Sequence, residues 1–161
     1  MTQLLARLIC SLAIYTQITA CSVVDAGQDP PSLSFEFMPV VFKSGRPAIG
    51  ESLESAFNSS EFDQGLALKH DVDALKNQPR FRVEIVGFAD PDECSGRACY
   101  ELSERRAKLV YDWLVDHGAP KKCLVGYKGR GAEEPLYRAG EEDVRQRNRR
   151  VEVTSLKPAE K

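Results

Sequence analysis

The sequence predicts a single α+β domain in which strands and helices alternate to form a two-layer α/β sandwich. Residues 80–88, "RFRVEIVGF", alternate apolar and polar side chains with the period of a strand, and residues 149–156, "RRVEVTSL", do the same. Between them, residues 102–118, "LSERRAKLVYDWLVDHG", repeat apolar side chains at helical spacing. Strands that alternate with helices along a chain favour one sheet covered by helices.

The segments before residue 80 predict a first strand and two helices. Residues 35–45, "FEFMPVVFKSG", have the composition of a strand with an interruption at Pro39. Residues 47–77 are helical in character, but "FNSSEFDQG" breaks the pattern. We therefore expect a short helix, a loop, and a second helix over residues 66–76.

The segments after residue 100 complete the alternation. In the main helix we expect Ser103 to be the N-cap residue and Gly118 and Pro120 to mark the end. Residues 123–131, "CLVGYKGRG", predict a third strand that runs into a glycine-rich turn, and residues 141–148, "EEDVRQRN", predict a short helix.

The composition fits one folded domain and argues against nucleic-acid binding. The chain has 161 residues, of which 42% are apolar and 29% are charged, enough for one core. Its formal net charge is -2 and its pI is about 5.8, so the broad basic surface that nucleic-acid binding requires is missing despite the local run "RQRNRR".

The N-terminus has the pattern of a targeting segment. Residues 8–18 form an apolar run that is shorter than the roughly 20 residues needed to span a bilayer. The run ends in "ITAC", which resembles a bacterial lipobox with Cys21 as the lipidated residue. This predicts a signal peptide over residues 1–20 and a flexible, Pro- and Gly-containing tether over residues 21–34. A plain secretory signal and a short N-terminal helix of the mature protein remain alternatives.

Three cysteines, Cys94, Cys99 and Cys123, would then lie in an oxidising compartment. We favour a structural disulfide between Cys94 and Cys99, with free cysteines or pairing to Cys123 as the alternative. A redox or metal site is a weaker interpretation, because the spacing is not CxxC and His70 and His117 are the only histidines. We therefore expect neither a metal nor another cofactor.

One arginine of the main helix is predicted to face inward. On a wheel of about 100° per residue, Arg106 falls within the apolar arc and Arg105 falls outside it. The arc consists of Leu102, Ala107, Leu109, Val110, Trp113 and Leu114. A buried guanidinium is unfavourable unless a carboxylate or a ligand satisfies it, so Arg106 needs a partner.

The strand end nearest to this helix offers Asp90 as that partner. The loop "VGFADPDE" brings the end of the strand to the start of the helix, whereas Asp92 and Glu93 are less constrained and expected to be solvated. Asp90 and Arg106 could simply form an ion pair. Alternatively, they could hold the two halves of a zwitterion, with the carboxylate binding an ammonium and the guanidinium binding a carboxylate.

Several motifs in order resemble one known family. "VEIVGFAD", "LSERRAKLVYDWLVDHGAPKKCLV", "GRGAEEP" and "RQRNRRVEV" are similar in order and spacing to the OmpA-like peptidoglycan-binding domain found in Pal lipoproteins, OmpA tails and MotB. The match covers roughly residues 40–154. It implies a βαβαβ sandwich over residues 35–161, here with a short extra helical insertion, and non-covalent binding of the diaminopimelate-containing stem peptide of peptidoglycan.

The resemblance also assigns candidate binding residues. The ligand-clamping aspartate and arginine of the family fall on Asp90 and Arg106, and its "RxxNRR" signature falls on Arg145, Asn148 and Arg149. The signature residues would line the site or fix the last strand, with structural pairing to glutamates as the alternative. The chain departs from the family in a loop, "CSGRACYE", that is about one residue longer, in "GRGAEEP", and in Phe88.

Together these patterns predict a binding module and not an enzyme. We expect an outer-membrane lipoprotein, anchored in membrane lipid through Cys21, whose domain faces the periplasm and binds peptidoglycan; Ser22 favours the outer membrane by resemblance. A hydrolase would need metal ligands, a Cys/His pair or suitably spaced acids, and neither histidine has an evident partner. The remaining alternative is a scaffold for envelope proteins, docking through the "AIGESLESAFNSSEFDQG" insertion.

Overall fold

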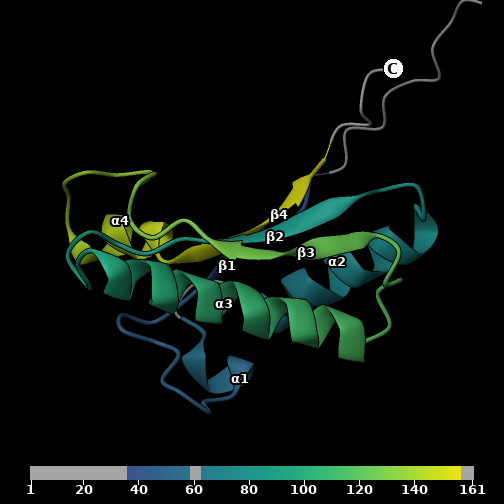
Figure 1. Ribbon diagram of the computed structural model, residues 1–161, viewed down its shortest axis with the longest axis horizontal. Helices are drawn as coiled ribbons and strands as arrows, with labels where there is room; N and C mark the ends of the chain where they lie inside the picture. The colour runs from purple at the N-terminus through teal and green to yellow at the C-terminus, as the bar shows by residue number, and fades with distance from the viewer. Residues whose placement is uncertain (1–35, 59–62, 157–161) are drawn as a thin grey trace, which may run out of the picture. The chain divides into compact units, whose positions relative to one another are not determined.

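The chain forms a four-stranded mixed sheet with the strand order β1-β4-β2-β3 (Figure 1). The computed structural model describes residues 36–58 and 63–156. Its strands are β1 (Val40–Val41), β2 (Val83–Gly87), β3 (Leu124–Gly129) and β4 (Arg150–Ser155). β2 runs parallel to β3 and antiparallel to β4, and β1 pairs antiparallel with the other edge of β4.

The helices complete the predicted two-layer α+β sandwich. They are α1 (Leu53–Ala56), α2 (Gln64–Asn77), α3 (Arg97–Asp116) and α4 (Glu142–Arg145), followed by a 3₁₀ turn, η1 (Gln146–Asn148). The long helix α3 joins the parallel strands β2 and β3 and lies along the sheet (Figure 1). The order βαβαβ is therefore present, and α1 is the expected extra helical insertion.

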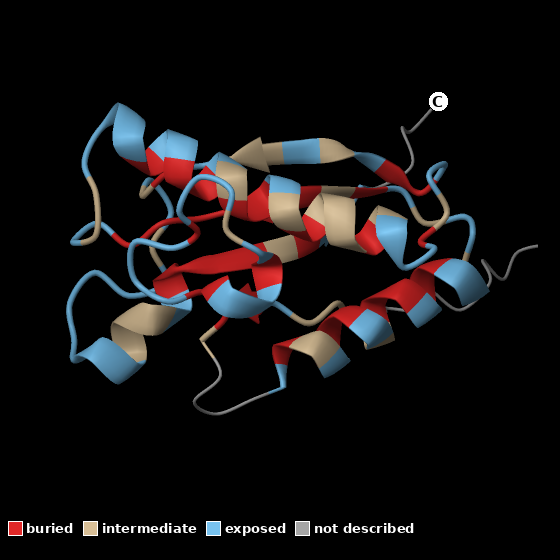
Figure 2. Ribbon diagram, turned by 90° about the horizontal axis from the view of Figure 1, so that it is seen from below, coloured by how far each residue is buried: buried red, intermediate tan, exposed pale blue. Residues whose placement is uncertain are grey.

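One hydrophobic core holds the layers together. Its members include Val83 and Ile85 from the sheet, Leu68 and Leu75 from α2, and Leu114 from α3, so both long helices pack on the same sheet face. Buried residues follow these inner surfaces in Figure 2. The alternation predicted for the central strand is confirmed. On the opposite face of the sheet Glu84 is only partly buried and forms an ion pair with Lys128.

Two glycines allow α3 to lie directly on the ends of β2 and β3. A Cβ atom on Gly87 would stand 2.0 Å from the backbone oxygen of Ser103, and one on Gly129 would stand 2.4 Å from the Ser103 Oγ. No larger residue fits without displacing the helix. The contact places the third turn of α3, with Arg106, against the ends of the central strands.

The prediction that Ser103 caps this helix is wrong. The helix begins at Arg97 after Gly96, so Ser103 lies inside it and is fully buried. Its hydroxyl donates to the Tyr100 backbone oxygen at 2.9 Å and accepts from the Gly131 N–H at 2.9 Å. The segment between the cysteines contains no helix-breaking residue after Gly96, which allows the helix to start earlier than its apolar periodicity indicates.

Most other elements lie where the sequence places them, but the first strand is shorter. Only Val40–Val41 pairs with β4, and Phe42 makes an isolated bridge to Phe57. Pro39 lacks an N–H and ends the pairing on that side. Within the described residues, no helix has the length and apolarity needed to cross a membrane. The predicted signal peptide, Cys21 and the whole predicted tether lie outside these residues.

Candidate functional site

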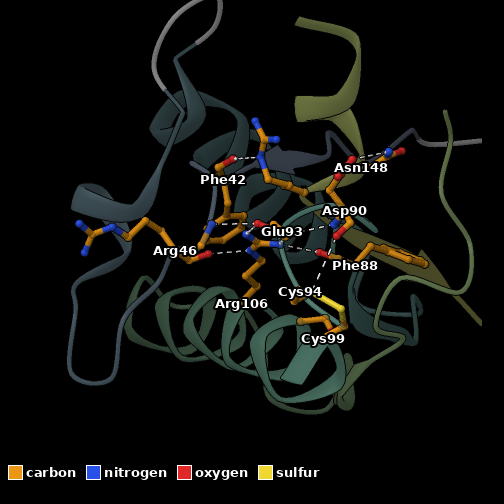
Figure 3. A network of polar contacts seen from close by, with 12 residues as sticks. Phe42, Arg46, Phe88, Asp90, Glu93, Cys94, Cys99, Arg106 and Asn148 are labelled. Carbon is orange, nitrogen blue, oxygen red and sulfur yellow. Dashed lines mark hydrogen bonds and ion pairs between the residues drawn. A yellow bond between two sulfur atoms is a disulfide. The ribbon is translucent and has the colours of Figure 1, made fainter. Parts of the chain in front are cut away.

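Arg106 faces inward, as predicted, and is completely buried (Figure 3). Its Nε donates to the Arg46 backbone oxygen at 2.7 Å, Nη1 to that of Phe88 at 3.0 Å, and Nη2 to that of Lys43 at 3.3 Å. The guanidinium carbon also lies 5.4 Å from the centroid of the Phe42 ring. Arg106 thus ties α3 to the end of β2 and to the loop after β1.

The carboxylate partner of Arg106 is Glu93, so the expectation that Asp90 pairs with Arg106 and that Glu93 is solvated is wrong. Nη1 donates to Glu93 Oε1 at 2.6 Å and Nη2 to Oε2 at 2.9 Å, a bidentate pair with side-chain exposures of 0% and 1%. The Glu93 carboxylate also accepts from the Asp90 N–H at 2.8 Å and the Gly45 N–H at 2.9 Å. These four donors satisfy a charge that would otherwise be costly to bury.

Loop geometry explains this exchange of partners. The Glu93 N–H donates to the Asp90 backbone oxygen at 3.1 Å, which turns the chain back toward α3. The next residue, Cys94, forms a disulfide with Cys99 in the first turns of α3, with their Cα atoms 5.2 Å apart. The predicted disulfide is therefore present, while Cys123 is buried and free.

Asp90 binds a different set of donors and is 1% exposed. Its Oδ2 accepts from Asn148 Nδ2 at 2.8 Å, and its Oδ1 accepts from Arg145 Nη2 at 3.0 Å and from the Asp92 N–H at 2.8 Å. Burial alone would raise the pKa of Asp90, but the hydrogen bonds from Asn148, Asp92 and Arg145 outweigh it and leave the pKa below its usual value. Asp90 is therefore an ionised acceptor at neutral pH.

The residues of the "RxxNRR" segment divide into two groups. Asn148 and Arg145 meet at Asp90; Asn148 also binds both backbone groups of Tyr137, and Arg145 also pairs with Asp92 at 2.8 Å. Arg149 is buried but donates to the Phe42 backbone oxygen at 3.2 Å and pairs with Glu142. Asn148 and Arg145 therefore line the candidate site. Arg149 joins β4 to β1 and α4, in agreement with the structural alternative.

The sequence profile of the OmpA family matches residues 42–149, more than half of the chain. The chain belongs to the OmpA family. No curated protein matches it significantly.

Solved OmpA-like structures share its fold. The peptidoglycan-associated lipoprotein from Burkholderia pseudomallei is 19% identical with a TM-score of 0.57, and the match covers 73% of this chain and 89% of the lipoprotein chain. The C-terminal domain of Helicobacter pylori MotB is 24% identical with a TM-score of 0.58, and the match covers 76% of this chain and 86% of the MotB chain. The OmpA-like domain of FopA1 from Francisella tularensis is 20% identical with a TM-score of 0.53, covering 74% of each chain.

The candidate site of this OmpA-family domain therefore consists of two adjacent charged centres. One is the acidic centre Asp90, held by Asn148 and Arg145, and the other is the basic centre Arg106, held by Glu93. The Asp90 backbone N–H links them by donating to Glu93. An acidic centre can bind a cation and a buried guanidinium can bind a carboxylate. Among the described residues, no three His, Cys, Asp or Glu side chains are grouped to hold a metal ion.

Proposed function

We propose that this chain is an outer-membrane lipoprotein whose OmpA-family domain binds peptidoglycan non-covalently and so attaches the envelope to the cell wall. The observation on which the proposal rests is the pair of buried charged centres, Asp90 after the end of β2 and Arg106 on α3. Buried charges are costly and are retained where they bind each other or a ligand. Family membership and the similarity to a peptidoglycan-associated lipoprotein support the choice of ligand.

In this proposal the ligand is the diaminopimelate end of the stem peptide, whose ammonium and carboxylate groups form a zwitterion. The ammonium binds the ionised carboxylate of Asp90, which Asn148 orients, and takes the place of the Arg145 guanidinium that contacts this carboxylate in the structure. The carboxylate binds the guanidinium of Arg106, which matches it with two parallel donors. No bond of the ligand is broken.

The proposed anchor lies in the part of the chain before residue 36. Lipidation of Cys21 after removal of residues 1–20 would hold the chain in outer-membrane lipid, and residues 21–34 would tether the domain in the periplasm. A few charge-assisted hydrogen bonds of about 1.5 to 3 kcal/mol each give one site only modest affinity. Many anchored copies facing one polymeric wall would bind it together through avidity.

The proposal is tested by sedimentation of the soluble chain, from Ser22 onward, with purified peptidoglycan sacculi. Asp90→Asn and Arg106→Lys change one charged centre each with little change in size. We expect both to lose at least tenfold in affinity, because Asp90→Asn removes the charge that binds the ammonium and Arg106→Lys removes the two parallel donors that bind the carboxylate. Asp112→Asn and Arg97→Lys make the same exchanges at exposed positions of α3 and should bind like the wild type. Circular dichroism verifies the fold of each variant.

A docking scaffold for envelope proteins is the second candidate. Ile49, at the start of the insertion that contains α1, is 91% exposed, which is unusual for a large apolar side chain and suits a protein contact. Under this alternative the wild type would not sediment with sacculi, and Ile49→Ser would weaken capture of envelope proteins while Asp90→Asn would not.

A further inference from the structure

Glu93 occupies the position on Arg106 that the proposed ligand needs. Its two carboxylate oxygens lie 2.6 and 2.9 Å from the two terminal nitrogens of the guanidinium, the bidentate arrangement expected for a bound carboxylate. Both side chains are essentially inaccessible to solvent. A ligand carboxylate can reach Arg106 only after Glu93 has left.

Arg145 likewise occupies the position on Asp90 that the ligand ammonium needs, but it is held less firmly than Glu93. Its Nη2 lies 3.0 Å from Asp90 Oδ1, where a ligand ammonium would bind. The Arg145 side chain remains 27% exposed and its second partner, Asp92, is 66% exposed, so water can replace these contacts. Glu93 thus takes the place of the ligand carboxylate, and Arg145 takes the place of the ligand ammonium. Of the two side chains, Arg145 is the easier to displace.

Two features hold Glu93 in place more firmly than Arg145. Its carboxylate accepts two backbone N–H groups, from Asp90 and Gly45, in addition to the guanidinium. It precedes Cys94, whose disulfide to Cys99 fastens the loop to the helix that contains Arg106. Glu93 and Arg145 both belong to the same chain as the groups they contact, so each competes at an effective concentration far above that of a dissolved ligand.

We propose that Glu93 is an internal carboxylate that competes with the ligand carboxylate for Arg106. The inference rests on the proposed function and extends it. The ligand enters by its ammonium end, which replaces Arg145 at Asp90, and the competition from Glu93 lowers the affinity for its carboxylate end. A chain without Glu93 would present Arg106 as an open receptor for carboxylates.

The first test is chemical rescue of Glu93→Ala. This variant leaves the Arg106 guanidinium buried without a counter-charge, so its thermal midpoint should fall clearly below that of the wild type. Acetate, propionate or diaminopimelate should then raise the midpoint in a saturable manner, whereas sodium chloride of equal ionic strength should not. The wild type and Glu101→Ala, an exposed glutamate paired with Arg97 on α3, should show no saturable response. A response that is equal in all three proteins would overturn the proposal.

The second test is binding to sacculi, with Glu93→Gln as a variant that keeps the shape of the side chain. Both Glu93 variants should bind at least tenfold more tightly than the wild type, because the internal competitor has lost its charge. Affinity equal to or below that of the wild type would make Glu93 a structural brace only, while leaving the proposed function intact. If no form sediments, the proposed function fails, and the rescue experiment, which uses no sacculi, still decides the inference.

Discussion

The Glu93–Arg106 pair should show strong energetic coupling in a double-mutant cycle. Arg106→Met leaves a buried carboxylate with only two backbone donors. Glu93→Gln leaves a buried guanidinium without a counter-charge, with three backbone acceptors and an amide oxygen as its partners. Breaking a buried pair from one side typically costs about 3 to 5 kcal/mol. The double variant removes both charges, so we expect it to be more stable than the sum of the two losses predicts, by about 2 to 3 kcal/mol.

Urea unfolding, followed by circular dichroism and by the fluorescence of Trp113, gives the free energy of unfolding of all four proteins. The exposed pair Arg97–Glu101, with side-chain exposures of 92% and 54%, is the matched control on the same helix. Its coupling should be much smaller, because water screens exposed ion pairs. If the losses at Glu93 and Arg106 are additive, with a coupling energy no larger than that of the control pair, the argument that each of these buried charges depends on the other is refuted.

Two further predictions concern packing and pH. Gly87→Ala places a Cβ 2.0 Å from the Ser103 backbone oxygen and should lower the free energy of unfolding by about 2 kcal/mol or more. Gly65→Ala, whose Cβ has its nearest contact at 3.2 Å, should not lower it. Equal thermal midpoints for the two variants would contradict this prediction. Burial raises the pKa of Asp71 to about 6. The folded chain then keeps a proton that the unfolded chain releases, so stability should fall as the pH rises from about 4 to about 6. Asp71→Asn should remove this part of the slope; a slope unchanged in the variant would show that another group is responsible.

Much of the fold was predictable because burial follows local periodicity. The alternation in residues 80–88 identified the inward side chains of β2, and the helical spacing in residues 102–118 identified the inner face of α3, including Arg106. The length of β1 was not predictable in this way. Its pairing with β4 joins residues about 110 positions apart in sequence, and its short extent depends on where Pro39 interrupts the ladder.

The partner of Arg106 could not be predicted for a related reason. The choice between Asp90 and Glu93 depends on how the loop after β2 turns. That turn is set by the disulfide and by the N–H of Gly45, which lies 48 residues before Glu93 in the sequence. The cysteine spacing was the only local signal, because a bridge from Cys94 to the helix fixes the side chain just before it. The groups that saturate Arg106 from Lys43 and Arg46 are backbone oxygens, which no side-chain pattern reveals.

The most direct test of the proposed site is the nuclear magnetic resonance signal of the Arg106 Nε–H group during titration with a soluble muropeptide that contains diaminopimelate. The protein is the ¹⁵N-labelled chain from Ser22 onward. The account predicts that this signal and the Asp90 amide shift together with one dissociation constant. In Asp90→Asn, neither the Arg106 signal nor the backbone amide of residue 90 should shift. Binding that moves other signals while those of Arg106 and Asp90 stay in place would contradict it and would make their charges purely structural.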